Sequence, residues 1–321
     1  MDGNQRVLIG PAAFAFSTFT SDTVVEYVAT TLRTEGLGAT ELLCLTNVLG
    51  QGRGGAPGYP SRERAAKIGE KLQELQLSIH GPYVISLTTD EASRLRNARA
   101  HMTLCLRLAD AVGATHVTLH AGSRQGGRAT QERVQQRLQE IVAKCDEDGL
   151  SAVPAPEVAG KIASFGSFEE ICTLAGVADC LFCWDVAHDY ARGGDVTAEA
   201  GLLRRLELIE RHIDLDRWRL PVHLSGIVVG RRGEVQHAPL DGGSDVPWRL
   251  FLSVLREQHF LDKVTIICES KAPDRDDFGW RVEEALKLQR FAESGAIEKQ
   301  YQPSGKLLTS YFAEETDDEE E

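Results

Sequence analysis

The sequence lacks any apolar stretch long enough to cross a bilayer, which takes about 20 consecutive apolar residues. Its amino terminus, MDGNQRVLIG, also lacks the basic and apolar regions of a secretory signal peptide. These absences exclude a membrane-spanning protein and argue against a secreted one. We therefore expect a cytoplasmic protein that does not act in a membrane.

The cysteines do not form a recognisable disulfide framework. There are seven of them, which is an odd number, and several lie inside apolar runs. A small secreted protein held together by disulfides would show an even number at regular spacing. We expect these cysteines to be reduced residues of the core.

An excess of positive charge is also missing, because the formal net charge is −13. Seven acidic residues lie in the final stretch EETDDEEE, which leaves −6 for the rest. A terminal run of like charge is typical of a disordered segment, so we expect an acidic tail at 294–321 and one folded domain at 1–293. The acidic balance argues against strong non-specific DNA binding, although bound divalent cations can reverse the local field.

The sequence does contain a regular alternation of short β-branched or apolar runs with longer amphipathic segments. We predict strands at 6–12, 41–46, 77–82, 115–121, 151–157, 181–186, 220–225 and 264–269. We predict helices at 22–34, 61–76, 90–112, 129–147, 167–176, 197–213, 246–258 and 278–293. This eightfold alternation predicts a single (β/α)8 TIM barrel, an α/β fold.

Local signals support some of these elements better than others. Thr89 with Asp90, and Ser167 with Glu170 three residues later, are capping signals for two of the helices. The strand at 151–157 is the weakest, because its two prolines lack backbone donors and would be costly in a central strand. Its assignment rests on spacing more than on propensity.

Metal-ligating residue types occur one or two per segment, each at or just past the end of a short apolar run. They are His80, His120, Glu157, Asp185, His188, His223, His237 and Glu269. In a parallel barrel the carboxyl ends of all strands meet at one rim. Imidazoles and carboxylates without thiolates favour a catalytic Zn²⁺ site, with Mn²⁺ or Fe²⁺ as alternatives. The sequence therefore predicts a metal-dependent enzyme.

The eight candidate ligands indicate, as a set, which reactions the site could catalyse. Each of these residues alone is weak evidence, since a single histidine at a strand end is more often a hydrogen-bonded structural residue. As a set they predict a multinuclear site, because a carboxylate such as Glu157 can bridge two cations about 3.5–4 Å apart. Such a site suits phosphoryl transfer, and aldose–ketose isomerisation is the alternative that the same ligands allow.

The predicted rim also carries a series of short motifs. In chain order they are GPAAFA, HGPYVISL, HAG, E-x-x-GK-x-x-x-FGS, D-x-AH, HLSGI, GEVQH-x-PL and ICES. Together they span most of the predicted barrel. The chain resembles the endonuclease IV family of apurinic/apyrimidinic endonucleases, which are DNA repair enzymes of the xylose isomerase-like barrel superfamily, and it is most similar to the shorter archaeal-type branch.

The resemblance implies two or three zinc ions with defined ligands. One zinc would be held by His80, His120 and Glu157, a second by Glu157, Asp185, His223 and Glu269, and a third by His188 and His237. The family completes the third site with an aspartate, where this chain has Val235. Either Glu234, one residue further back, substitutes for that aspartate, or the third metal is weak or absent.

The resemblance also implies a substrate, namely DNA containing abasic sites, cleaved at the phosphodiester 5′ to the lesion. Tyr83 matches a family tyrosine that packs against DNA at the lesion, and a tyrosine packed beneath a loop is the alternative. Lys161, Arg192, Arg231 and Arg232 are available for phosphate contacts, with a solvated surface as the alternative for each.

Glu157 and Glu269 are the expected catalytic carboxylates, because bound metals would supply most of the electrostatic stabilisation. A sugar isomerase or epimerase with one or two divalent cations at the same rim is the second hypothesis. A metal-stabilised protein that recognises damaged DNA without cutting it is the third. The oligomeric state stays open.

Overall fold

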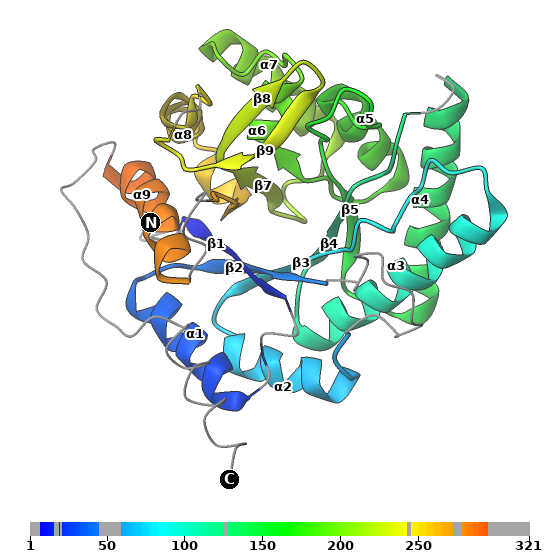
Figure 1. The fold of residues 1–321 in the computed structure, drawn as a ribbon, viewed down its shortest axis with the longest axis horizontal. Helices are drawn as coiled ribbons and strands as arrows, with labels where there is room; N and C mark the ends of the chain where they lie inside the picture. The colour runs from blue at the N-terminus through cyan, green and yellow to red at the C-terminus, as the bar shows by residue number, and fades with distance from the viewer. Residues whose placement is uncertain are drawn as a thin grey trace.

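Eight parallel strands form the centre of the computed structural model, which describes residues 7–15, 19, 21–44, 59–124, 128–242, 245–271 and 278–294. The strands are β1 (Leu8–Ala15), β2 (Ala39–Leu43), β3 (Gln76–His80), β4 (His116–Leu119), β5 (Val153–Pro156), β6 (Trp184–Asp185), β7 (Leu220–Leu224) and β10 (Val264–Cys268). They pair in the order β5-β4-β3-β2-β1-β10-β7-β6, and a parallel bridge from Glu157 to Cys183 joins the two end strands. The predicted barrel is confirmed (Figure 1).

Helices surround the strands on the outside (Figure 1). They are α1 (Asp22–Thr34), α2 (Arg62–Leu72), α3 (Ala92–Val112), α4 (Arg128–Asp148), α5 (Phe168–Ala178), α7 (Glu199–His212), α8 (Trp248–Glu257) and α9 (Phe278–Ser294), with a short 3-10 helix at Leu261–Lys263. All eight predicted helices are confirmed to within a few residues at most ends.

The two predicted caps differ in outcome. Ser167 and Glu170 form the expected capping box, in which each side chain accepts from the other residue's backbone N–H. At α3 the prediction is wrong, because the helix begins after Glu91. Thr89 Oγ1 accepts from the Glu91 backbone N–H at 3.2 Å, so this threonine stabilises the turn before the helix.

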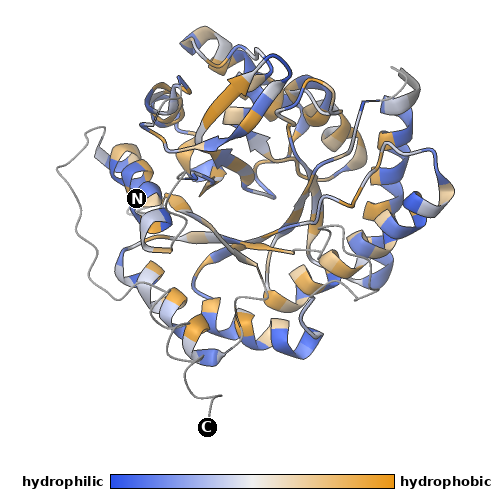
Figure 2. Cartoon of the chain, viewed as in Figure 1, coloured by the Kyte–Doolittle hydropathy of each residue, from blue (hydrophilic) through white to orange (hydrophobic). Residues whose placement is uncertain are grey.

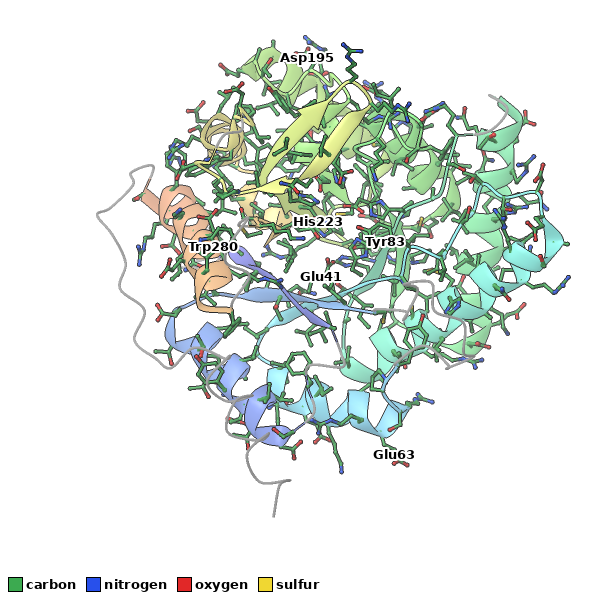
Figure 3. The ribbon with its side chains drawn as sticks, viewed as in Figure 1. Glu41, Glu63, Tyr83, Asp195, His223 and Trp280 are labelled. Carbon is green, nitrogen blue, oxygen red and sulfur yellow. The ribbon has the colours of Figure 1, made fainter. Side chains whose placement is uncertain are left out.

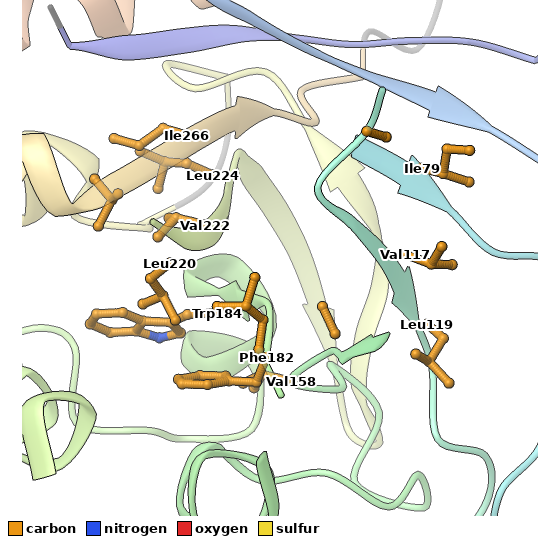
Figure 4. Close-up of a cluster of buried hydrophobic side chains, with 14 of the residues drawn as sticks. Ile79, Val117, Leu119, Val158, Phe182, Trp184, Leu220, Val222, Leu224 and Ile266 are labelled. Carbon is orange, nitrogen blue, oxygen red and sulfur yellow. The ribbon is translucent and has the colours of Figure 1, made fainter. Parts of the chain in front are cut away.

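The strands separate an apolar layer from a polar interior. Because side chains alternate along a strand, Ile79, Val117 and Leu119 point away from the side that His80 and Thr118 occupy. These apolar residues belong to the buried layer between strands and helices (Figure 4). Figure 2 shows that hydrophobic residues concentrate in the strands and on the helix sides that face them. The polar side chains are thereby gathered inside the ring.

Strand β5 keeps its two prolines because of its place in the barrel. It pairs along its length only with β4, through a register that matches Pro154 to Val117 and Pro156 to Leu119. On the other side of β5, the pairing is limited to one bridge, between Glu157 directly after the strand and Cys183. A strand that is hydrogen-bonded mainly on one side tolerates residues without an N–H donor.

Other expectations from the sequence have mixed outcomes. All seven cysteines are buried and free, as expected. Among the described residues, no helix is sufficiently long and apolar to cross a membrane. The predicted acidic tail lies almost entirely outside the described residues, since α9 ends at Ser294.

Two elements of the structure, a short helix and a hairpin, were not predicted from the sequence, and both lie at the rim of the barrel. A short helix, α6 (Val186–Ala191), follows β6 directly and carries His188. An antiparallel hairpin, β8 (Gly226–Gly230) with β9 (Gly233–Ala238), follows β7 and carries His237. Each lies within a segment that the sequence pattern assigned to a loop.

A buried ion pair holds α6 against α7. Arg205 donates from Nη2 to Asp189 Oδ1 at 3.0 Å and from Nε to Asp189 Oδ2 at 2.5 Å. Trp184 Nε1 donates to the same Oδ2 at 3.2 Å. Both charged side chains are at most 7% exposed. This contact therefore fixes the helix that carries His188.

We predict that Arg205→Met lowers the free energy of unfolding by about 3–5 kcal/mol, because it leaves the Asp189 charge buried without a partner. The neighbouring Arg204 pairs with Asp195 at the surface and is 62% exposed. Arg204→Ala is thus the matched control, with an expected change within about 1 kcal/mol. Urea unfolding of both variants measures the difference, and equal small losses would contradict the role of the buried pair.

Candidate metal centre

The barrel brings all eight predicted ligands into one connected group, called the ligand cluster below. Within it, His80, His120 and Glu157 place one ligand atom each within 4.8 Å of one another, and so do Glu157, Asp185, His223 and Glu269, and also Asp185, His188 and His237. Glu157 and Asp185 each belong to two of these groups. These two shared carboxylates link the three ligand groups into one arrangement that could hold more than one cation.

Each ligand reaches the cluster because of its position in a βα unit. His80 and Asp185 end β3 and β6, and His223 lies in β7. His120, Glu157 and Glu269 come directly after β4, β5 and β10. The parallel strands all point to the same rim, so strand ends that are far apart in sequence meet there. Figure 3 shows His223 and Tyr83 inside the ring, whereas Glu63 and Asp195 lie on its outside.

Glu157 occupies the middle of the cluster and is fully buried. Its Oε2 lies 3.1 Å from His120 Nδ1 and 3.4 Å from His80 Nε2. Its Oε1 lies 3.0 Å from His223 Nδ1 and 3.6 Å from His188 Nδ1. The two oxygens of one carboxylate thus face two different sets of imidazoles.

At two of the histidines, hydrogen bonds to the backbone determine which ring nitrogen carries the proton. A carbonyl oxygen can only accept, so His80 Nδ1 donates to Gly81 O at 2.8 Å and His188 Nδ1 donates to Val158 O at 3.0 Å. In the neutral ring the Nε2 lone pair then points at a carboxylate. For His80 this is Glu157 Oε2, and for His188 it is Glu234 Oε2 at 3.3 Å.

His237 shows the same pattern with a hydroxyl in place of a carbonyl. Ser225 Oγ donates to Gly226 O at 2.8 Å, so it accepts from His237 Nδ1, also at 2.8 Å. The Nε2 lone pair of His237 then faces Glu269 Oε2 at 3.6 Å. Two acceptors that face each other repel unless a proton or a cation lies between them.

The pKa values of three histidines show where the cluster favours a positive charge. Burial lowers the pKa of His80, but the Glu157 carboxylate outweighs this effect and raises it to about 9. Burial also lowers the pKa of His188, and Asp185 and Glu234 raise it to about 10. For His120 burial prevails and lowers the pKa to about 4. In the metal-free chain at neutral pH, protons on His80 and His188 take the places that cations would occupy.

Several buried polar atoms of the cluster make no hydrogen bond of good geometry with the described residues, although other polar atoms of the cluster face them. They are Glu157 Oε2, Asp185 Oδ2, His188 Nε2 and Glu41 Oε1. A buried polar atom without a partner is costly and usually marks a missing water or ion. The orphaned atoms and the nitrogen and oxygen donor set fit a group of divalent metal ions.

A pocket of about 210 Å³ opens onto the cluster, lined by His80, Tyr83, His120, Glu157 and Glu269 among others. Tyr83 is 80% exposed, so no loop among the described residues covers it. Its ring stacks on His120 with centroids 4.9 Å apart and an interplanar angle of 9°. Tyr83 therefore presents one aromatic face to a molecule that enters the pocket.

The basic residues divide into two groups. Lys161, Arg231 and Arg232 are exposed and lie together, because a bridge joins Lys161 to Gly233 at the turn of the β8–β9 hairpin. Arg192 lies elsewhere: its Nη1 donates to backbone carbonyls in the loop after β5, and it lines a groove of about 700 Å³ with residues of α5 and α7. The structure gives Arg192 a role in holding that loop, and its contact with phosphate stays a prediction.

Two further residues of the cluster were missed by the sequence analysis. Glu41 in β2 is fully buried and lies 3.3 Å from His223 Nε2 (Figure 3). Cys183, assigned only to the core, has its sulfur within 4.8 Å of ligand atoms of Glu157 and His223. The available signal for Glu41 was a single charged residue at the start of the predicted strand ELLCLT.

Relatives of known sequence match between about half and three quarters of this chain. An uncharacterized protein of Methanocaldococcus jannaschii is 28% identical over 249 residues, which are 76% of this chain and 86% of that protein. A probable endonuclease 4 of Streptomyces coelicolor is 25% identical over 173 residues, which are 51% of this chain and 58% of that protein.

Solved structures show the same fold. Endonuclease IV from Thermus thermophilus matches with a TM-score of 0.64 at 21% identity, over 89% of this chain and 99% of that one. D-psicose 3-epimerase from Clostridium cellulolyticum matches with a TM-score of 0.60 at 13% identity, over 89% and 98%. The sequence pattern of one family also matches residues 32–292. The chain belongs to the xylose isomerase-like TIM barrel family.

Proposed function

We propose that this protein is a metal-dependent apurinic/apyrimidinic endonuclease, which hydrolyses the phosphodiester 5′ to an abasic site in DNA. The observation that carries the proposal is the chain of three ligand groups linked through Glu157 and Asp185. Sugar isomerases and epimerases of the superfamily need one or two cations at this rim. The third ligand group, formed by Asp185, His188 and His237, therefore supports phosphoryl transfer over isomerisation.

The residues of the cluster would perform distinct tasks. Bound divalent cations would lower the pKa of water and neutralise the charge that develops on phosphate oxygens. Glu157, with its two oxygens facing different imidazoles, would hold two ions side by side. Glu269 would bind on the side of His223 and His237, whose nitrogens lie 3.3 and 3.6 Å from its Oε2.

The residues around the pocket suit a DNA substrate. The exposed ring of Tyr83 offers a flat apolar surface for the sugar or base next to a missing base. Lys161, Arg231 and Arg232 at the hairpin turn would contact backbone phosphates and position the duplex without reading its sequence. Recognition would then depend on the opened lesion and the bent backbone.

A sugar isomerase or epimerase is the second candidate function. Glu157, Asp185, His223 and Glu269 form a complete four-ligand group by themselves, which is sufficient for a single catalytic cation. The structural match to D-psicose 3-epimerase is consistent with this candidate at the level of the fold.

One experiment separates these functions. The purified full chain, with its metals quantified, is incubated with a duplex that contains one abasic site and separately with a panel of aldoses and ketoses. We expect nicking 5′ to the lesion that a chelator abolishes and added Zn²⁺ restores. Turnover of a sugar without nicking would replace the proposal by the isomerase, and retention of the duplex in a gel without nicking would indicate a non-catalytic binding protein.

Glu157→Gln tests the bridging carboxylate. We expect it to lose at least one zinc and to lower kcat by about 100-fold or more, because even residues behind the ligands cost about 10–100-fold when they are changed. Lys161→Ala should act mainly on KM and weaken the salt dependence of binding. The matched control for Glu157→Gln is Glu210→Gln, which removes an exposed carboxylate paired with Lys263. Full activity of Glu157→Gln with unchanged metal content would refute the bridging role.

Glu234 is proposed as the third-site ligand in place of the family aspartate. Its Oε2 lies 3.3 Å from His188 Nε2, and its side chain is 19% exposed. We expect Glu234→Gln to lower the zinc content by one ion per chain, as measured by elemental analysis. Val235 is 58% exposed, so adding Val235→Asp to that variant should restore the ion. Unchanged stoichiometry in Glu234→Gln would exclude Glu234 as a ligand.

A further inference from the structure

Glu41 is a buried carboxylate beneath the ligand cluster. Strand β2 carries it into the barrel interior, where its exposed fraction is 0%. Ser78 Oγ donates to its Oε2 at 3.0 Å, and Thr118 Oγ1 donates to the same atom at 3.2 Å. Two neutral hydroxyls do not compensate a buried negative charge, so a cationic or strongly donating neighbour must do so.

That neighbour is His223. The Nε2 atom of its ring lies 3.3 Å from both oxygens of Glu41, and the side chain is completely buried. On the opposite side of the ring, Nδ1 lies 3.0 Å from Glu157 Oε1 and 3.3 Å from Glu269 Oε2. One nitrogen of His223 therefore faces the cluster, and the other faces Glu41.

Three other histidines of the cluster show the same division between their two ring nitrogens. His80 and His188 each donate one ring N–H to a backbone carbonyl, and His237 donates to Ser225. In every case the second nitrogen is left with its lone pair directed at the cluster. For His223 the acceptor is a charged carboxylate instead of a neutral oxygen.

We propose that Glu41 is a positioning residue, which accepts the Nε2–H of His223 and thereby presents the Nδ1 lone pair of His223 to a metal ion shared with Glu157 and Glu269. A carboxylate behind a ligating imidazole fixes its tautomer and orientation and makes it a stronger ligand. The proposal rests on the proposed metal centre but is independent of the substrate.

The test compares zinc binding by the full-length wild type, Glu41→Gln and Thr40→Val. In Glu41→Gln the amide oxygen of the new side chain can still accept from Ser78 and Thr118, so the fold is retained while the charge is lost. Thr40 Oγ1 donates to Pro11 O at 2.9 Å, away from His223, which makes Thr40→Val the matched control on the same strand. Competition with a chromophoric chelator gives the dissociation constants, and elemental analysis at saturating zinc gives the stoichiometry.

We expect Glu41→Gln to weaken zinc binding about 10- to 100-fold at one site, with the same number of ions at saturation and unchanged binding in Thr40→Val. Ser78→Ala, which removes one donor to Glu41, should weaken binding by a smaller factor. In the zinc-loaded wild type, ¹⁵N-histidine NMR should show a proton on His223 Nε2, and Glu41→Gln should make that proton exchange faster.

Three results would overturn the role of Glu41. Loss of one ion at saturating zinc would make Glu41 a ligand itself, since its carboxylate also groups with His80 and Glu269. Unchanged zinc affinity in both Glu41→Gln and Ser78→Ala would exclude an effect on the metal. A lower melting temperature of the metal-free protein with unchanged affinity would make Glu41 purely structural. Failure of the wild type to bind zinc would refute the metal centre itself.

Discussion

Lone pairs that face each other in a largely buried cluster are the constraint on which the rest of this structure depends. His80, His188 and His237 each use one nitrogen for a neutral acceptor and direct the other at a carboxylate oxygen. Such pairs are stable only with positive charge between them. At His80 and His188, whose pKa values are raised, protons supply it in the metal-free chain. A set of divalent cations would supply it across the whole cluster. In the metal-free chain the cluster therefore carries an unfavourable interaction that bound cations would relieve.

The barrel makes this arrangement possible by building the cluster on rigid elements. Apolar residues such as Val117 pack outward against the helices, so the polar side chains have only the interior to occupy (Figure 4). The buried pair of Asp189 with Arg205 fixes α6, and the bridge from Lys161 to Gly233 ties the hairpin to the loop after β5. These contacts hold His188 and His237 in the cluster, although neither residue lies at the end of one of the eight parallel strands.

Much of the fold was predictable from the sequence, because the alternation of β-branched runs and amphipathic segments repeats eight times. The ligands at strand ends followed from the rule that parallel strands share one rim. The sequence pattern missed α6, since six residues are too few to show a helical period. It missed the hairpin, since the strands of the hairpin are largely exposed or half-buried and form no long apolar run. It missed Glu41, since one charge at the start of an apolar run is not a distinctive signal. The register of β2 against β3 sets Glu41 beside Ser78 in the barrel interior.

The central claim is that cations, and not protons alone, lie between the facing acceptors of the cluster. Anomalous diffraction at the zinc absorption edge, from crystals grown with Zn²⁺, tests it most directly. The account predicts at least two anomalous peaks, one between His80 Nε2 and Glu157 Oε2 and one bounded by Asp185, His223 and Glu269. An absence of anomalous peaks in the cluster, with His80 hydrogen-bonded directly to Glu157, would contradict it.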